Sequence, residues 1–193
     1  MLKLYHSPQS RSSRFIWMLE ELGQPYEIEY VTIRRGDGSG EADPNNPHPQ
    51  GKVPALVHDG RLIWESGAIT LYLTDAFPEA GLGPKVGEPA RSEYLAWLFF
   101  YAAEVESNMM IKFLNVENPV ASQIYDKMIE RFDGQLQKHP YISGDHFTAA
   151  DVLFGSAVQW GETMLPKTPA FDAYLARLVE RPAYTRAQAK ENP

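Results

Sequence analysis

The first third of the chain mixes two hydrophobic periods, one typical of strands and one typical of helices. Apolar and charged residues alternate over residues 26–33 (YEIEYVTI), which predicts a strand. Residues 13–23 (SRFIWMLEELG) predict a helix that ends at Gly23, and its apolar residues surround the helix, which favours burial on several sides. A further strand is expected at residues 2–6 and a further helix at residues 65–77.

Two short apolar runs predict a hairpin between these elements. The runs PALVH and RLIW flank Asp59-Gly60, and an Asp-Gly pair in that position is typical of a two-residue turn. The strand–helix–strand unit before them implies two parallel strands joined by a right-handed crossover. We therefore expect an α/β domain with a mixed four-stranded sheet, interrupted by a long polar stretch over residues 34–52.

The remainder of the chain has helical patterns and no convincing strand. Proline and glycine residues concentrate at 78–89 (PEAGLGPKVGEP), which predicts a linker. Helical spacing follows over 90–115, as one helix or two, and then over 120–139, 148–164 and 170–181, with a further turn or two in 182–193. We expect an α/β domain over residues 1–77 and an all-helical domain over residues 90–193.

Composition and charge exclude several classes of function. The formal net charge is −7, whereas proteins that bind nucleic acid or anionic membranes are usually basic. The chain has no cysteine, which excludes disulfides, a thiolate nucleophile and a cysteine zinc site. Its five histidines lack the spacing of metal ligands, so no metal is expected. The start is not typical of a signal peptide and the longest apolar run is too short to span a membrane, so we expect a cytoplasmic protein.

A cluster of serines and arginines, SPQSRSSR at residues 7–14, stands at the start of the first predicted helix. A structural explanation is available, because serine is a common helix N-cap and arginine often lies on a solvated face. Ser12 and Ser13 are the serines placed for capping. The alternative is that hydroxyl groups and positive charge at a helix start bind an anion.

Two later segments carry features that suit a peptide-like ligand. A proline at the start of a strand, as in Val53-Pro54, is unusual unless its missing N–H is not needed there or its peptide bond is cis. A cis bond turns the backbone of the preceding residue outward, where it could pair with an extended ligand. Ser66 at a helix start is an N-cap by default, but free N–H groups there also bind carboxylates. Glu65 beside it could bind an ammonium group.

The segments LYHSPQSRSSRFIWMLEELG, GKVPAL and ESGAI, together with the two-domain layout, resemble the cytosolic glutathione transferases over essentially the whole chain. The resemblance implies a thioredoxin-like domain followed by an all-helical domain, glutathione as co-substrate, and a homodimer. Thr148-Ala-Ala-Asp151 fits a capping box and also resembles the family's motif in the helical domain. Both interpretations give that segment a structural role only.

The resemblance also assigns residues to the parts of glutathione. By similarity, Val53 beside cis-Pro54 would offer its backbone to the cysteinyl amide. Glu65 and Ser66 would hold the ammonium and carboxylate of the γ-glutamyl end. The glycyl carboxylate would lie near a further pair, Lys52 and His48, although asparagine is common in the family where His48 stands.

A hydroxyl group at the front of the first helix would help to keep the bound sulfur anionic. A free thiol has a pKa near 8.5, and each unit by which the pKa falls corresponds to about 1.4 kcal/mol. Ser10 lies four residues before Arg14, as in family members that use serine, so we assign the donor to Ser10. The alternative donors are Tyr5, Ser12 and Arg11.

The family's second substrate is a small hydrophobic electrophile, and the resemblance implies that helical-domain residues bind it. The candidates are Tyr101, Asn108, Met109 and Trp160, although such residues at helical spacing usually form core. The predicted reaction is conjugation of the glutathione thiolate. The alternatives are a specialised peroxidase, isomerase or dehalogenase, or a protein that binds glutathione or another ligand without catalysis.

Overall fold

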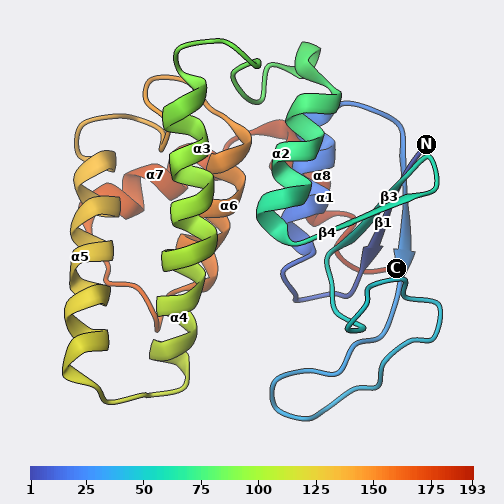
Figure 1. The fold of residues 1–193 in the computed structure, drawn as a ribbon, viewed down its shortest axis with the longest axis horizontal. Coiled ribbons are helices and arrows are strands. Elements are labelled where there is room, and N and C mark those ends of the chain that lie inside the picture. The colour runs from blue at the N-terminus through green and yellow to red at the C-terminus, as the bar shows by residue number, and fades with distance from the viewer. The chain divides into compact units, whose positions relative to one another are not determined.

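The computed structural model describes residues 1–193, and the chain forms two compact units (Figure 1). The first unit combines residues 1–73 with residues 182–193, and the second spans residues 74–181. The units differ from the predicted domains at two places, since residues 74–77, predicted in the first domain, belong to the second unit. The segment 182–193, which the sequence pattern assigned to the helical domain, belongs to the first unit.

The sheet of the first unit has the predicted mixed topology. Its strands are β1 (Leu2–His6), β2 (Tyr26–Tyr30), β3 (Ala55–His58) and β4 (Arg61–Trp64). They are arranged in the order β2-β1-β3-β4, with β1 parallel to β2 and the other neighbours antiparallel. Asp59 and Gly60 both have positive φ and form the predicted tight turn between β3 and β4.

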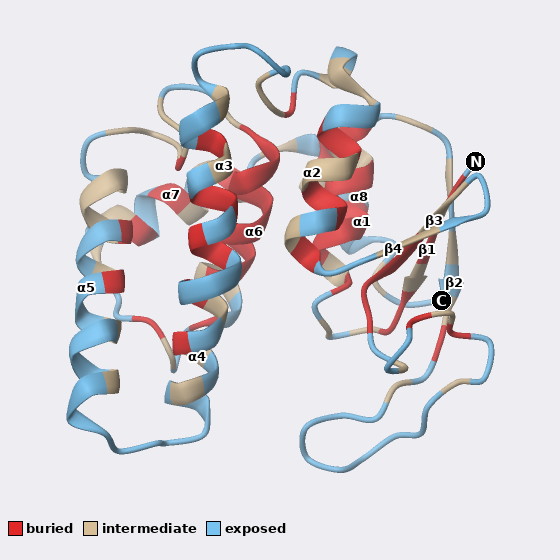
Figure 2. Ribbon diagram, viewed as in Figure 1, coloured by how far each residue is buried: buried red, intermediate tan, exposed pale blue.

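Helix α1 (Ser13–Leu22) is the most buried helix of the first unit, as Figure 2 shows. It ends as predicted at Gly23, whose φ of 69° allows its N–H to reach the Leu19 carbonyl at 3.2 Å. The short helix α8 (Pro182–Gln188) packs against α1, with the rings of Trp17 and Tyr184 in edge contact at 5.2 Å. Because Arg14 to Leu19 are all buried, α1 is covered on more than one side, and α8 supplies part of that cover.

The second unit is helical. Its helices are α3 (Arg91–Phe100), a π-helical turn η2 (Tyr101–Val105), α4 (Glu106–Phe113), α5 (Pro119–Leu136), α6 (Ala149–Trp160) and α7 (Pro169–Val179). Helix α2 (Ser66–Ala76) begins in the first unit and ends in the second, and the 3₁₀ turn η1 (Pro78–Ala80) follows it. Residues 149–157 of α6 are all buried, and the Phe154 ring contacts Phe132 at 4.8 Å. This helix is the centre of the helical core.

The capping box predicted at the start of α6 is present. Thr148 donates its backbone N–H to Asp151 Oδ2 at 2.7 Å, and Asp151 in turn belongs to the first turn of the helix. Asp151 is fully buried and also accepts from the Ile142 N–H and the Tyr174 hydroxyl, both at 2.8 Å. The segment therefore has the structural role that the sequence predicted.

Candidate functional site

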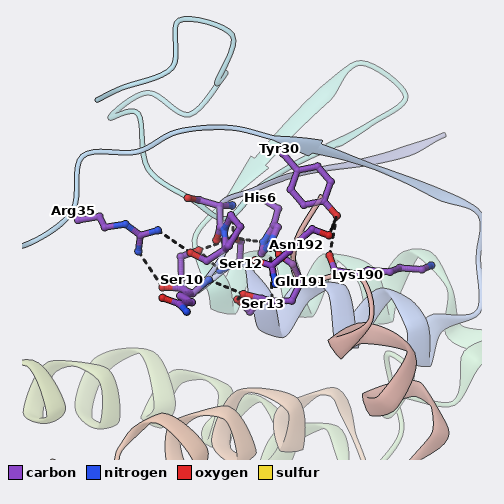
Figure 3. A network of polar contacts seen from close by, with 12 residues as sticks. His6, Ser10, Ser12, Ser13, Tyr30, Arg35, Lys190, Glu191 and Asn192 are labelled. Atoms are coloured by element: carbon purple, nitrogen blue, oxygen red, sulfur yellow. Dashed lines mark hydrogen bonds and ion pairs between the residues drawn. The ribbon is translucent and has the colours of Figure 1, made fainter. Parts of the chain in front are cut away.

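The serine-rich loop between β1 and α1 is organised around Ser12 (Figure 3). Ser12 is completely buried, and its Oγ lies 2.7 Å from Ser10 Oγ and 2.8 Å from His6 Nδ1. The Ser7 N–H also donates to Ser12 Oγ at 3.2 Å. Ser12 occupies the N-cap position of α1, but its hydroxyl makes no capping bond. The capping role considered for Ser12 is therefore wrong, because His6 and the loop already use this hydroxyl.

Ser10 lies at the rim of this loop. Ser10 is half-buried, and its Oγ accepts a hydrogen bond from the Ser12 backbone N–H at 3.2 Å. The exposed residue Arg11 follows it. Tyr5 is half-buried in β1 and shares a face of the sheet with Lys3, whereas His6 points to the other face. Of the candidate donors, Ser10 and Ser12 are thus the pair that the structure joins directly.

The loop also contacts a segment that sequence reasoning did not associate with it, residues 190–192. The Glu191 carbonyl lies 2.9 Å from His6 Nε2, and its carboxylate accepts from the Gln9 N–H at 2.6 Å and the Ser13 hydroxyl at 2.7 Å. The Tyr30 hydroxyl donates to the Lys190 carbonyl at 2.9 Å. No local pattern predicts these contacts, because more than 150 residues separate most of the partners.

His6 is the buried ionisable group of this cluster. Burial lowers its pKa, while the hydrogen bond and charge of Glu191 act in the opposite direction. The ring is therefore neutral in the free protein near neutral pH. A neutral imidazole carries one proton, so its two nitrogens have different roles.

The segment before β3 contains the predicted cis peptide bond, between Val53 and Pro54. Both residues are buried, and strand pairing begins one residue later, at Ala55. The Asn46 side chain fixes the approach to this bond, since its Nδ2 donates to the Lys52 carbonyl at 3.0 Å. The backbone of Val53 is thus held at the end of the strand.

The start of α2 lies beside this segment. Glu65 is exposed and has a φ of 71°, and Ser66 is buried at the first position of the helix. The first backbone N–H groups of such a helix lack partners within the helix and attract anions. Glu65 and Ser66 therefore offer an acidic side chain and a helix N-terminus next to each other.

The strand register brings these segments to one edge of the sheet. Ala55 pairs with both Tyr5 and Trp64, so continuing the two ladders places His6 and Glu65 on either side of Pro54. Ser7 follows on the same edge. The serine loop, the cis-proline segment and the start of α2 are therefore neighbours.

The two predicted residues for the glycyl carboxylate also lie near Glu65. Burial lowers the pKa of His48, and the charges of Glu65 and Lys52 act on the same ring in opposite directions. His48 is buried, and its ring lies 5.8 Å from the ring of Trp64 in an edge contact. Lys52 is exposed.

The four residues predicted to bind the electrophile lie in the helical unit and differ in how far they are buried. Tyr101 is buried in η2 and contacts the Phe154 ring at 5.1 Å, so it belongs to the helical core. Asn108 is buried in α4, where its Nδ2 donates to the Glu104 carbonyl at 2.8 Å. Met109 is half-buried on the same helix, and Trp160 is exposed at the end of α6.

The structure brings together no group of three or more His, Cys, Asp or Glu side chains suited to a metal ion. None of its helices combines the length and the apolar character needed to cross a membrane.

Comparison with known proteins settles the family. Residues 4–81 match the model of the glutathione S-transferase N-terminal domain, and residues 116–182 match that of the C-terminal domain. The chain belongs to the glutathione transferase family. The predicted thioredoxin-like domain with a mixed four-stranded sheet, followed by an all-helical domain, is thereby confirmed.

Individual relatives in the glutathione transferase family cover most of the chain. Glutathione S-transferase 3 of Schizosaccharomyces pombe is 30% identical over 172 residues, which are 78% of this chain and 70% of that protein. A crystal structure of a glutathione transferase from Methylococcus capsulatus is 31% identical, covers 99% of this chain and 98% of that chain, and has a TM-score of 0.82. A sphingomonad glutathione S-transferase in complex with glutathione is 28% identical, covers 98% of each chain, and has a TM-score of 0.81.

Proposed function

We propose that this glutathione transferase conjugates the thiolate of glutathione to small hydrophobic electrophiles and that the Ser10 hydroxyl holds the sulfur. The observation that carries the proposal is the edge of the sheet where the serine loop, the cis-proline segment and the start of α2 meet. The related sphingomonad enzyme, solved with glutathione, supports the same co-substrate. No metal takes part in the proposed reaction.

Each part of glutathione has a chemically suitable partner at this edge. The backbone of Val53, held before β3, pairs with the cysteinyl unit in the manner of an added strand. Glu65 accepts from the γ-glutamyl ammonium group, and the N-terminus of α2 at Ser66 binds the neighbouring carboxylate. Lys52 and His48 face the glycyl carboxylate.

The thiol is then placed near the start of α1. A thiol with its ordinary pKa near 8.5 is mostly protonated at neutral pH, while the nucleophile is the thiolate. A hydroxyl donor and the positive end of the helix dipole both favour the anion. Ser10, at the rim of the loop and four residues before Arg14, supplies that donor in this proposal.

The protein acts on its electrophile as a homodimer in this proposal, as the family resemblance implies. The helical unit exposes several large apolar side chains that suit contact with a second copy or an apolar substrate, among them Phe99, Phe113 and Ile124. Sedimentation of the purified protein measures the oligomeric state. A monomer at assay concentration would overturn this part of the proposal.

The experiment is an assay of glutathione with a chloronitrobenzene electrophile on wild type and Ser10→Ala. We expect the variant to lower kcat/KM about a hundredfold, as loss of one preorganised donor to a reacting anion does. Glutathione affinity, measured by calorimetry, is expected to stay close to the wild-type value. The matched control is Ser39→Ala, an exposed loop serine whose hydroxyl donates to Asp37.

The outcomes separate the alternatives. Persistent turnover in Ser10→Ala would show that another group holds the sulfur. Tight glutathione binding without turnover of several electrophiles and peroxides would indicate a binding protein. Absence of glutathione binding by the wild type would overturn the proposed function itself.

A further inference from the structure

Four groups form a continuous hydrogen-bonded chain that leads from the rim of the site into the protein (Figure 3). Ser10 Oγ lies 2.7 Å from Ser12 Oγ, and Ser12 Oγ lies 2.8 Å from His6 Nδ1. On the far side of the ring, His6 Nε2 lies 2.9 Å from the Glu191 carbonyl oxygen. Ser10 is half-buried, whereas Ser12 and His6 are completely buried. The chain thus connects the proposed sulfur site to a buried base.

The Glu191 carbonyl fixes the direction of every hydrogen bond in this chain. A carbonyl oxygen only accepts, so His6 Nε2 carries the proton of the neutral ring and Nδ1 has the lone pair. Ser12 must then donate its single hydroxyl proton to Nδ1. With that proton used, Ser10 donates to Ser12 and presents a lone pair to the ligand.

A competing arrangement has poorer geometry. Ser12 Oγ also lies 3.4 Å from the Ser7 carbonyl, which is a longer contact than the 2.8 Å to His6 Nδ1. The Ser7 N–H donates to the same oxygen at 3.2 Å and fills its remaining capacity to accept. The free protein therefore presents an accepting Ser10, which is the wrong polarity for a bound thiolate and the right polarity for a bound thiol.

We propose that His6 takes the proton of the glutathione thiol through Ser10 and Ser12, a step that rests on the proposed role of Ser10. The S–H bond breaks as its proton moves to Ser10 Oγ, the Ser10 proton moves to Ser12 Oγ, and the Ser12 proton moves to His6 Nδ1. The products are one thiolate and one imidazolium, so protons and charge balance. The three hydrogen bonds between the sulfur and His6 Nδ1 have then reversed, while Nε2 still donates to the Glu191 carbonyl, and Ser10 donates to the sulfur anion.

Glu191 is the positioning residue of this relay. Its carboxylate is held by the Gln9 N–H and the Ser13 hydroxyl, which places its carbonyl on Nε2 and its second carboxylate oxygen 3.9 Å from the same nitrogen. That negative charge lies close to the imidazolium. The Tyr30 ring packs edge-on against the His6 ring, with 5.6 Å between ring centres. The carboxylate therefore favours the protonated state that the thiolate requires.

The relay resets after the sulfur has reacted. Once the thiolate has formed its bond to the electrophile, the sulfur no longer carries a negative charge, and only the Glu191 carboxylate still favours the imidazolium. Burial of His6 then favours its neutral form, since burial lowers the pKa of this ring. The proton returns through Ser12 to Ser10, which passes it to water at the rim of the loop.

The test compares His6→Asn with His58→Asn. Asparagine keeps a hydrogen-bonding group near the position of His6 Nδ1 but takes up no proton. His58 is a matched control, because its Nδ1 also lies 2.8 Å from a hydroxyl oxygen, that of Tyr72. The thiolate absorbance of bound glutathione is measured against pH. In His6→Asn we expect the pKa of the bound thiol to rise by about 1, which leaves about tenfold less thiolate at neutral pH. His58→Asn and the glutathione Kd of both variants are expected to match wild type.

A second measurement does not depend on a variant that folds. Heteronuclear NMR of the histidine ring nitrogens in the wild-type protein is expected to show His6 with only Nε2 protonated when free, and doubly protonated in the glutathione complex. A ring that stays neutral while the bound thiol ionises would overturn the relay, as would an unchanged thiol pKa in folded His6→Asn. A wild-type complex whose thiol keeps its ordinary pKa would instead overturn the proposed role of Ser10.

Discussion

Each unit of the molecule contains a buried polar network, around Ser12 in the first and around Asp151 in the second, and the two differ in the freedom of their protons. In the helical unit, Asp151 only accepts, and two of its donors are the backbone N–H groups of Thr148 and Ile142, which cannot turn away. In the first unit, Ser12 and His6 each both donate and accept. The hydrogen bonds to Asp151 have one fixed direction. The hydrogen bonds among hydroxyl and imidazole groups can run in either direction, and a bound ligand can reverse them.

The largest expected effect comes from breaking the fixed network. Asp151→Ala leaves the Thr148 and Ile142 N–H groups buried without this partner and the Tyr174 hydroxyl with only the backbone carbonyl of residue 151 at 3.4 Å, which costs about 4 kcal/mol of unfolding free energy. Urea denaturation measures this loss, and Asp126→Ala, at an exposed position on α5, is the control. Turnover per folded molecule should not change. A loss below about 1 kcal/mol would show that this network is not structural.

A smaller effect is expected from deleting residues 190–193. The deletion removes the hydrogen bonds of Glu191 to His6, Gln9 and Ser13, which destabilises the start of α1 by about 2 kcal/mol. Native-state hydrogen exchange should speed up in β1 and α1 and stay unchanged in α6. If hydrogen exchange in α6 accelerated as much as in β1 and α1, the two networks would not stabilise their units separately.

The smallest expected effect is on acid stability, where the two units have carboxyl groups shifted in opposite directions. Burial raises the pKa of Glu20, but hydrogen bonds from Lys190, Tyr26 and Arg186 together outweigh it and lower the pKa to about 2. The stabilisation from Glu20 is therefore complete above its usual pKa of 4.5 and is lost as the pH falls towards 2. Burial raises the pKa of Asp151 from 3.8 to about 6, so the stability of the fold decreases as the pH rises between these values and the buried carboxyl group ionises.

The comparison of Glu20→Gln with wild type isolates the first of these contributions. Because Lys190 and Arg186 are about half exposed, we expect the pair contacts to contribute only about 1 kcal/mol. The difference in unfolding free energy between wild type and variant should be present at neutral pH and vanish near pH 2. A difference that grows on acidification would reverse the assigned direction of the shift.

Local sequence patterns predicted much of the fold. The Asp59-Gly60 turn, the end of α1 at Gly23 and the capping box at Thr148 are all present, because each depends on residues within a few positions of one another. The stretch 90–115, left open as one helix or two, is two α-helices joined by the π-helical turn at 101–105. Its apolar pattern continues through the turn, so periodicity alone does not locate it.

The candidate site was less completely predictable. The cis bond before Pro54 and the placement of Glu65 at the start of α2 follow from short segments, and the structure has both. The partners of the serine loop do not follow in this way, since Glu191 lies 185 positions from His6. The capping role considered for Ser12 failed for a local reason, because its hydroxyl pairs with His6 and Ser10 and not with the first N–H groups of α1.

The cover that α8 gives to α1 has a consequence for synthesis of the protein. The first unit includes residues 182–193, so the face of α1 that α8 covers stays bare while the ribosome makes the intervening helical unit. The helical unit, whose residues are continuous in sequence, has no such delay. The nascent chain therefore completes its second unit before its first, and the interval in between is when a chaperone has an exposed apolar face to bind.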